Sequence, residues 1–163
     1  MMSTASVTSL TSSNPDVASG VAQFLSPVVI EMTALAVNGK QAHWHVRGAN
    51  FIGVHELLDA IVGRAIEWAD LAAERVVALG LPVDARIQTV ASATRSAPLT
   101  PGFQRSENAI VEIINQMDVA ITTVNTAIAE LADIDASSQD VAIEIGRGLE
   151  KDRWFLFAHV SES

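Results

Sequence analysis

The chain has 163 residues, of which 49% are hydrophobic, and it carries 10 Lys and Arg against 19 Asp and Glu, a formal net charge of -9. This length suits a single domain, and the acidic balance argues against partners with phosphate backbones or anionic membranes. The absence of cysteine excludes disulfides and thiolate chemistry. The hydrophobic fraction is more than one small bundle can hide, which indicates subunit interfaces.

The beginning of the chain is rich in Ser and Thr and almost uncharged. Such a composition cannot offset its own ordering entropy, so we expect a flexible N-terminal tail at 1–18 and one helical domain at 19–163. The start lacks the basic and apolar regions of a signal peptide, and no later segment approaches 18 uncharged apolar residues. We therefore expect a cytoplasmic protein without a membrane segment.

Two long helices joined by a tight corner are predicted next. Apolar residues at steps of three and four predict a first helix over about 21–45, which residues 47–50 interrupt. The same period returns over 51–79 as a second helix of about 28 residues. Gly80 and then Pro82 end it, the usual order of a C-cap glycine followed by proline.

A long connection and two further helices complete the prediction. Residues 82–102 are rich in Pro, Ser, Thr and Ala, with a short helix expected at 84–93. An apolar stripe over 110–131 predicts the third long helix. Ser137 and Asp140 resemble a capping box that opens the fourth. The expected fold is all-α, a ferritin-like four-helix bundle with a short extra helix in the connection between its second and third helices.

The second predicted helix carries a set of chemically useful side chains on one face. At about 100° per residue, His55, Asp59, Asp70 and Glu74 project into one arc of about 100°. His43 precedes the corner by about as many residues as His55 follows it, so the antiparallel hairpin places both histidines at similar height. Imidazole and carboxylate are the ligands that redox iron uses.

Distance divides these residues into two groups. About 15 residues separate the His55 and Asp59 pair from the Asp70 and Glu74 pair, which is roughly 22 Å along a helix. One chain therefore supplies His43, His55 and Asp59 together, but it cannot add the other two carboxylates. If two copies of this helix cross antiparallel near residues 63–65 (Gly63, Arg64 and Ala65), two identical sites form, each shared between subunits.

The usual di-iron site of a helical bundle needs Glu-x-x-His pairs inside one subunit, and this chain contains none. The site is therefore expected at an interface instead of in the bundle core. Two imidazoles and three carboxylates suit Fe(II), with Mn, Co or Zn as competitors.

A purely structural interpretation stays open beside the metal site. The two distant carboxylates could belong to a solvated helix face or pair with Arg75 or Arg64. The two histidines could equally be capping or core residues. His45 lies off the ligand face and is expected to be exposed, and His159 near the end of the chain has no assigned role.

The chain resembles the Dps proteins, also called mini-ferritins, in the motif KQAHWHVRGANF at 40–51, followed by HELLD at 55–59 and DLAAER at 70–75. The resemblance spans roughly residues 20–160 in the order of its elements. It implies a hollow homododecamer in which Fe(II) is oxidised by hydrogen peroxide, preferred over dioxygen, and stored as a ferric mineral. It also implies a two-iron ferroxidase centre at each two-fold interface, with ligands resembling His43, His55 and Asp59 of one subunit and Asp70 and Glu74 of its partner.

The resemblance also suggests roles outside the ligand set. Trp44 and Trp154 resemble family tryptophans near the centre that intercept radicals, although Trp154 could equally be an ordinary packing residue. An acidic group around the last corner sits where the resemblance places a negatively lined three-fold pore for iron entry, or it is simply solvated: Asp133, Asp135, Asp140 and Glu144.

Two other functions remain as alternatives. The protein could be a DNA-compacting structural protein, but its first 20 residues contain no Lys or Arg, which argues against direct DNA binding through the tail. It could also be a helical metalloenzyme that uses the interface metal as a Lewis acid on an organic substrate, although no separate nucleophile or substrate-binding constellation stands out.

Overall fold

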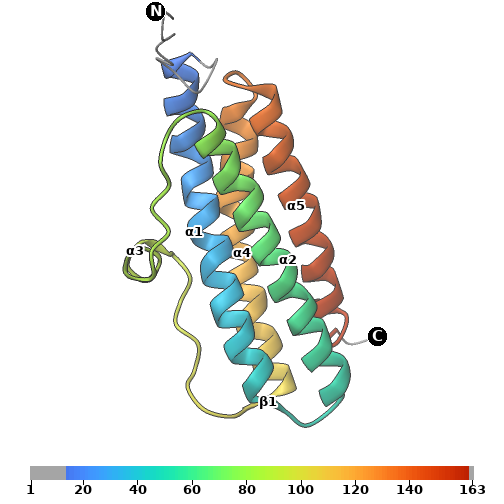
Figure 1. The fold of residues 1–163 in the computed structure, drawn as a ribbon. Coiled ribbons are helices and arrows are strands. Elements are labelled where there is room, and N and C mark those ends of the chain that lie inside the picture. The colour runs from blue at the N-terminus through green and yellow to red at the C-terminus, as the bar shows by residue number, and fades with distance from the viewer. Residues whose placement is uncertain (1–13, 162–163) are drawn as a thin grey trace, which may run out of the picture.

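Four long helices lie side by side in the computed structural model, which describes residues 14–161 (Figure 1). The helices are α1 (Pro15–His45), α2 (Phe51–Ala78), α4 (Ser106–Leu131) and α5 (Ala136–Phe157). Tight corners join α1 to α2 and α4 to α5, and a long crossover with the short helix α3 (Ile87–Ala93) joins α2 to α4. The predicted all-α, ferritin-like bundle with an extra helix in its second connection is confirmed.

The first helix begins earlier than the sequence pattern predicted. Asn14 is the N-cap, and its side-chain oxygen accepts a hydrogen bond of 2.9 Å from the Asp16 backbone N–H. Pro15 occupies the first helical position, where its fixed φ is already helical. Helical structure therefore includes 15–18, which we had assigned to the tail, and the rest of that expected tail (1–13) lies outside the described residues.

Helix α1 is also more apolar than we expected, since by length and composition alone it could cross a membrane. In the bundle, 56% of its most apolar 18-residue window is buried. It packs against both α2 and α4, and its buried residues include Leu25, Met32 and Leu35. Much of the apolar pattern is thus explained by burial against these two helices.

The corner between α4 and α5 is capped differently from the prediction. Asp135, and not Ser137, is the N-cap of α5, because the Asp135 carboxylate accepts a hydrogen bond of 2.9 Å from the Ser138 backbone N–H. The same carboxylate accepts one of 2.8 Å from Arg75 on α2. These bonds hold the start of α5 against the end of α2.

A second polar contact joins α2 to α5 nearer the middle of the bundle. The guanidinium of Arg64 donates two hydrogen bonds, of 2.8 and 2.6 Å, to the carboxylate of Asp152, which is 2% exposed. Close by, the indole of Trp68 packs against Gly148, where a Cβ atom would overlap the ring. Charge pairing and a missing side chain thus fix the spacing of these two helices.

Candidate metal centre

Two histidines meet where α1 and α2 turn at their shared corner. His43 lies in the last turn of α1 and is buried, and His55 lies in the second turn of α2. Their rings stack with centroids 3.7 Å apart and an angle of 18° between their planes. The hairpin therefore brings together the two imidazoles that the sequence predicted at similar height.

Hydrogen bonds fix the protonation of both rings. His43 Nδ1 lies 2.7 Å from the carbonyl oxygen of His55, and His55 Nδ1 lies 2.8 Å from the carbonyl oxygen of His43. A carbonyl only accepts, so each Nδ1 must carry the proton. In the neutral rings both Nε2 atoms then keep their lone pairs, the state in which histidine binds a metal while its other nitrogen is anchored to a backbone carbonyl.

Asp59 follows His55 by one helical turn, and its carboxylate forms an ion pair of 2.5 Å with Lys40 on α1. The hydrogen bond from Lys40 lowers the pKa of Asp59, and the positive charge of the same ammonium group lowers it further. Asp59 is therefore ionised at neutral pH and ready to bind a cation. Lys40 was not predicted as the partner of Asp59, because the two residues lie on different helices.

Asp70 and Glu74 lie farther along α2, and both are exposed. Among the described residues neither forms a hydrogen bond or ion pair, because the two arginines that could neutralise them point elsewhere. Arg64 binds Asp152, and Arg75 binds Asp135. The alternative interpretation, in which these arginines pair with the two carboxylates, is therefore wrong.

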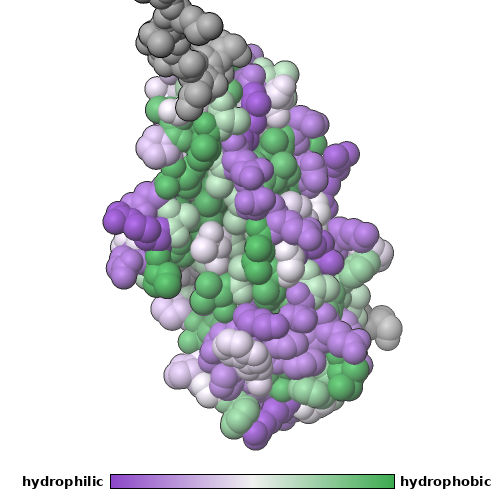
Figure 2. Space-filling model, in the orientation of Figure 1, coloured by the Kyte–Doolittle hydropathy of each residue, from purple (hydrophilic) through white to green (hydrophobic). Residues whose placement is uncertain are grey.

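A groove lies between α1 and α2 on the outer face of the bundle, and Asp59 is the one candidate ligand that lines it. It has a volume of about 790 Å³, and its lining includes Lys40, Trp44 and Asp59 at one end and Ala69, the neighbour of Asp70, at the other. Three large hydrophobic side chains in the groove are more than half exposed: Val37, Trp44 and Ile66. Figure 2 shows hydrophobic bands along α1 and α2 on this face.

Gly63 lies in the middle of this groove, with open space where its side chain would be. Of the three residues near which we expected two helices to cross, it is the one on the outer face. Ala65 is fully buried, and the Arg64 guanidinium is bound to Asp152. Because Gly63 has no side chain, the backbone of another helix can approach α2 closely at this point.

Within residues 14–161, no three His, Asp or Glu side chains of one chain gather into a group that could hold a metal ion. The buried acidic side chains in this part of the chain are Glu31 and Asp152. Asp152 is held by Arg64, and Glu31 accepts hydrogen bonds from the Thr94 hydroxyl and the Arg95 backbone N–H. The described bundle core therefore has no carboxylate set of the kind a di-iron site requires.

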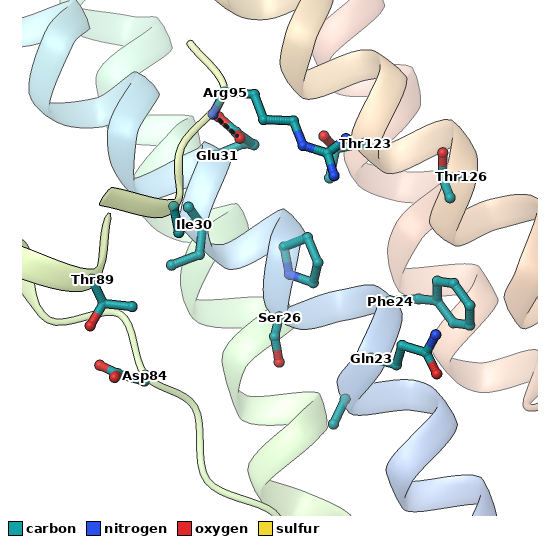
Figure 3. Close-up of a pocket in the computed structure, with 13 residues that line it drawn as sticks. Gln23, Phe24, Ser26, Ile30, Glu31, Asp84, Thr89, Arg95, Thr123 and Thr126 are labelled. Carbon is teal, nitrogen blue, oxygen red and sulfur yellow. Dashed lines mark hydrogen bonds between the residues drawn. The ribbon is translucent and has the colours of Figure 1, made fainter. Parts of the chain in front are cut away.

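A second cavity, of about 550 Å³, lies between α1, α4 and the segment around α3 (Figure 3). Its lining is mainly apolar and hydroxyl-bearing, with Glu31 and Asp84 as its two carboxylates. Both are already engaged, Glu31 as described and Asp84 by Arg86 at 2.8 Å. This cavity contains no histidine and is not part of the candidate metal centre.

The other residues singled out in the sequence are not part of the histidine pair. Asp133, Asp140 and Glu144 are exposed near the corner between α4 and α5, while Asp135 is occupied as a helix cap. Trp154 is 63% exposed near the end of α5 and contacts Phe155 edge to face. His45 is half-buried, not exposed as we had expected: its ring lies near that of Phe103, and its Nδ1 bonds to the Gln41 carbonyl oxygen.

Comparisons with known proteins show which family the chain belongs to. A family model described as a ferritin-like domain matches residues 29–162. The "DNA protection during starvation protein" of Agrobacterium fabrum is 32% identical over 145 residues, covering 88% of this chain and 90% of that protein. Its namesake from Mycolicibacterium smegmatis is 30% identical over 160 residues, covering 90% of this chain and 80% of that protein.

Solved structures give the same result. The structure of Dps from Microbacterium arborescens, described as the high iron form, superposes with a TM-score of 0.91 at 54% identity, covering 94% of this chain and 100% of that one. A Mycobacterium smegmatis Dps structure gives a TM-score of 0.88 at 28% identity, covering 93% of each chain. The fold, the corner motif and these relatives together show that the chain belongs to the Dps family of the ferritin-like superfamily.

Proposed function

We propose that this protein is a ferroxidase that oxidises Fe(II), preferably with hydrogen peroxide, and stores the product as a ferric mineral inside a hollow homododecamer. The observation that carries the proposal is the pair formed by His43 and His55. Each ring uses Nδ1 to bond to the other residue's carbonyl oxygen, so both Nε2 lone pairs are left to bind a metal ion. Membership of the Dps family supports iron storage and DNA protection as the general role.

The centre is proposed to be shared between two copies of the chain. A second α2, lying antiparallel in the groove and crossing near Gly63, brings its own Asp70 and Glu74 toward His55 and Asp59 of the first copy. Exposed apolar side chains along the groove, with the small Gly63 between them, favour such close contact. Within residues 14–161 neither Asp70 nor Glu74 has a hydrogen-bond or ion-pair partner, which suits carboxylates that bind a cation shared with the other copy.

The proposed reaction uses iron as substrate. Two Fe(II) ions each give one electron to hydrogen peroxide, the O–O bond breaks, and with two water molecules the products are two ferric oxyhydroxide units and four protons. Delivery of both electrons together avoids the hydroxyl radical that a single ferrous ion would release. Histidine Nε2 atoms and carboxylate oxygens hold the ions, and an ion at Asp59 competes with Lys40, which donates to its Oδ1.

Other residues take supporting roles in this proposal. Trp44 lines the groove together with Asp59, which suits an indole that gives up an electron when a radical escapes. Asp133, Asp140 and Glu144 remain exposed near the corner between α4 and α5, where a ring of such carboxylates would attract ferrous ions. Removal of Fe(II) and peroxide would protect DNA without any direct contact.

The proposal is tested by loading the assembled, iron-free protein with Fe(II) under anaerobic conditions and then adding hydrogen peroxide. We expect a ferric absorbance that co-elutes with the protein on size exclusion, one peroxide consumed for every two Fe(II), and little spin-trapped hydroxyl radical. Iron that precipitates free of the protein, or a radical yield equal to that of the protein-free reaction, would contradict the proposal.

A further inference from the structure

A cluster of basic and aromatic side chains lies at the end of the bundle where the chain turns from α1 into α2. Two short strands pair there in parallel, β1 (Val46–Arg47) with β2 (Gln104–Arg105), so that Arg47 stands opposite Arg105. Val46 is buried and both arginines are exposed. Because side chains alternate along a strand and the two arginines are paired in register, they share the outer face of this strand pair.

An exposed aromatic ring orients one of these arginines. The Cζ atom of Arg47 lies 3.2 Å from the ring centroid of Phe103, which is 59% exposed. The ring of His45 lies near the same phenylalanine, with centroids 5.4 Å apart. Stacking on the ring limits the freedom of the guanidinium while its N–H groups, which point outward in its own plane, remain able to donate.

The positive charge of the cluster is only partly neutralised. Four other arginines of the described chain form ion pairs of 2.5 to 2.8 Å with aspartates: Arg64, Arg75, Arg86 and Arg153. Arg47 has no carboxylate within 4.0 Å in the same part of the chain, and Arg105 has Glu107 at the longer distance of 3.5 Å. Like charges directly opposite on paired strands are unfavourable unless an anion compensates them.

The start of α4 adds to this positive character. Its N-cap is Arg105, which provides no side-chain acceptor for the first backbone N–H groups of the helix. The Ser106 hydroxyl points back to the corner and donates to the Ala49 carbonyl oxygen at 2.7 Å. The start of α4 thus has no side-chain cap, and the positive end of its helix dipole lies beside the two arginines, which favours an anion there in addition to Glu107 of the first turn.

We propose that Arg47 and Arg105 form a binding site for a phosphoryl oxyanion. Guanidinium groups match the oxygens of phosphate with two parallel hydrogen bonds each, a geometry that a chloride or a single carboxylate does not use as fully. In a chain with a net charge of -9, this corner is a local exception to the acidic surface. The phosphoryl group could be that of free phosphate or that of a nucleic-acid backbone, and the experiment separates the two.

The experiment titrates the assembled, iron-free protein with orthophosphate and follows binding by calorimetry. The site variant is the double substitution Arg47→Gln with Arg105→Gln, and the matched control is Arg86→Gln, an exposed arginine in the segment before α3. We expect saturable binding by the natural protein and by the control, and binding weakened by about tenfold or more in the site variant. Absence of saturable binding, or equal binding by all three proteins, would overturn the proposal.

A third variant tests whether the position of Arg47 matters for binding in addition to its charge. Phe103→Leu keeps every charge but removes the ring on which Arg47 stacks, so we expect orthophosphate binding to weaken by about two- to fivefold. Unchanged binding in Phe103→Leu would show that stacking does not preorganise the site. Circular dichroism and size exclusion establish that each variant keeps its fold and assembly.

The second arm replaces orthophosphate with a short DNA duplex at low salt. If the duplex binds, and the double variant lowers both its affinity and the dependence of that affinity on salt, the natural source is a nucleic-acid backbone. If orthophosphate binds and the duplex does not, the source is free phosphate. If neither orthophosphate nor the duplex binds, the proposal is wrong.

Discussion

His43 and His55 each direct Nδ1 at the main-chain carbonyl of the other residue, at 2.7 and 2.8 Å, so the corner between α1 and α2 is closed by two mutual hydrogen bonds. This reciprocity gives both rings the same tautomer before any ion is present. It also makes each ring dependent on the position of the other helix. The imidazole half of the candidate centre is therefore assembled by the fold itself.

Replacement of His55 tests the role of this pair. His55→Gln removes one imidazole ligand, and we expect peroxide-dependent Fe(II) oxidation to fall by about a hundredfold or more, since loss of a ligand's hydrogen-bond partner alone costs about 10- to 100-fold. Stopped-flow absorbance of ferric product measures it. His45→Gln is the control, since that ring bonds to Gln41 outside the pair, and it should keep nearly the natural rate. Equal losses in both variants would remove His55 from the centre.

Mixed assemblies test whether two subunits share each site. His55→Gln and Glu74→Gln should each be nearly inactive alone. When the two variants are co-assembled from an equal mixture, a shared site is complete only if one subunit supplies the natural histidine and its partner supplies the natural glutamate. Random pairing gives this combination at about a quarter of the sites. The oxidation rate should recover to about that fraction of the natural rate. If each site belongs to one subunit, the mixture stays inactive, and physical mixing without reassembly is the control.

Lys40→Met removes the ammonium group that occupies Asp59. Exposed ion pairs are weak, so the variant should bind Co(II), a redox-stable probe, only about two- to fivefold more tightly. The pKa of Asp59 should rise at the same time, because the hydrogen bond from Lys40 is the main cause of its lowering. Titration by d–d absorbance measures the affinity. Lys151→Met, on α5, is the control, and weaker binding in Lys40→Met would show that the lysine assists the ion.

The pH dependence of stability should reveal the cap at Asp135. Hydrogen bonds from Ser138 and Arg75 lower the pKa of Asp135, so its ionised form stabilises the fold. The contribution is full above the ordinary aspartate pKa of about 3.9 and is lost as the pH falls through the lowered value. Asp135→Ala should therefore cost about 1–2 kcal/mol at pH 7 and progressively less in acid, as measured by urea unfolding. Asp133→Ala, at an exposed neighbour, should cost little at either pH.

Gly148→Ala tests the close approach of α2 and α5. The added methyl group would overlap the indole of Trp68, and overpacking of this kind costs about 1–3 kcal/mol. Thermal unfolding measures the loss. Trp68→Leu makes room for the methyl group, so the double variant should be more stable than the two single losses predict when added. Simple additivity would mean that the ring and the glycine are independent.

Much of this molecule could be predicted from its sequence because the signals are local. The helical period located all four long helices, and the spacing of His43 and His55 about the corner predicted that they would meet. The helix starts were less accurate, since Asn14 and Asp135 act as caps through hydrogen bonds that apolar periodicity does not encode. Capping chemistry, read before periodicity, could have found both.

Ion pairs between residues far apart in the chain could not be predicted from the sequence. Lys40 binds Asp59, and Arg64 binds Asp152, because helix packing brings those residues together. Glu31 is buried and looks like a candidate ligand from its type alone, yet the segment after α3 supplies its hydrogen bonds. No pattern of spacing distinguishes such satisfied carboxylates from the exposed Asp70 and Glu74. Only packing does.

The inward attachment of Arg64 and Arg75 makes α2 electrostatically one-sided. Both guanidinium groups form ion pairs with aspartates of the α4–α5 hairpin. Between Asp59 and Glu74, the other charged side chains of α2 are therefore all acidic. Two such helices laid against each other would repel unless something positive came between them. Divalent cations could supply that charge, in which case the loading of iron and the tightening of the subunit contact would be one event.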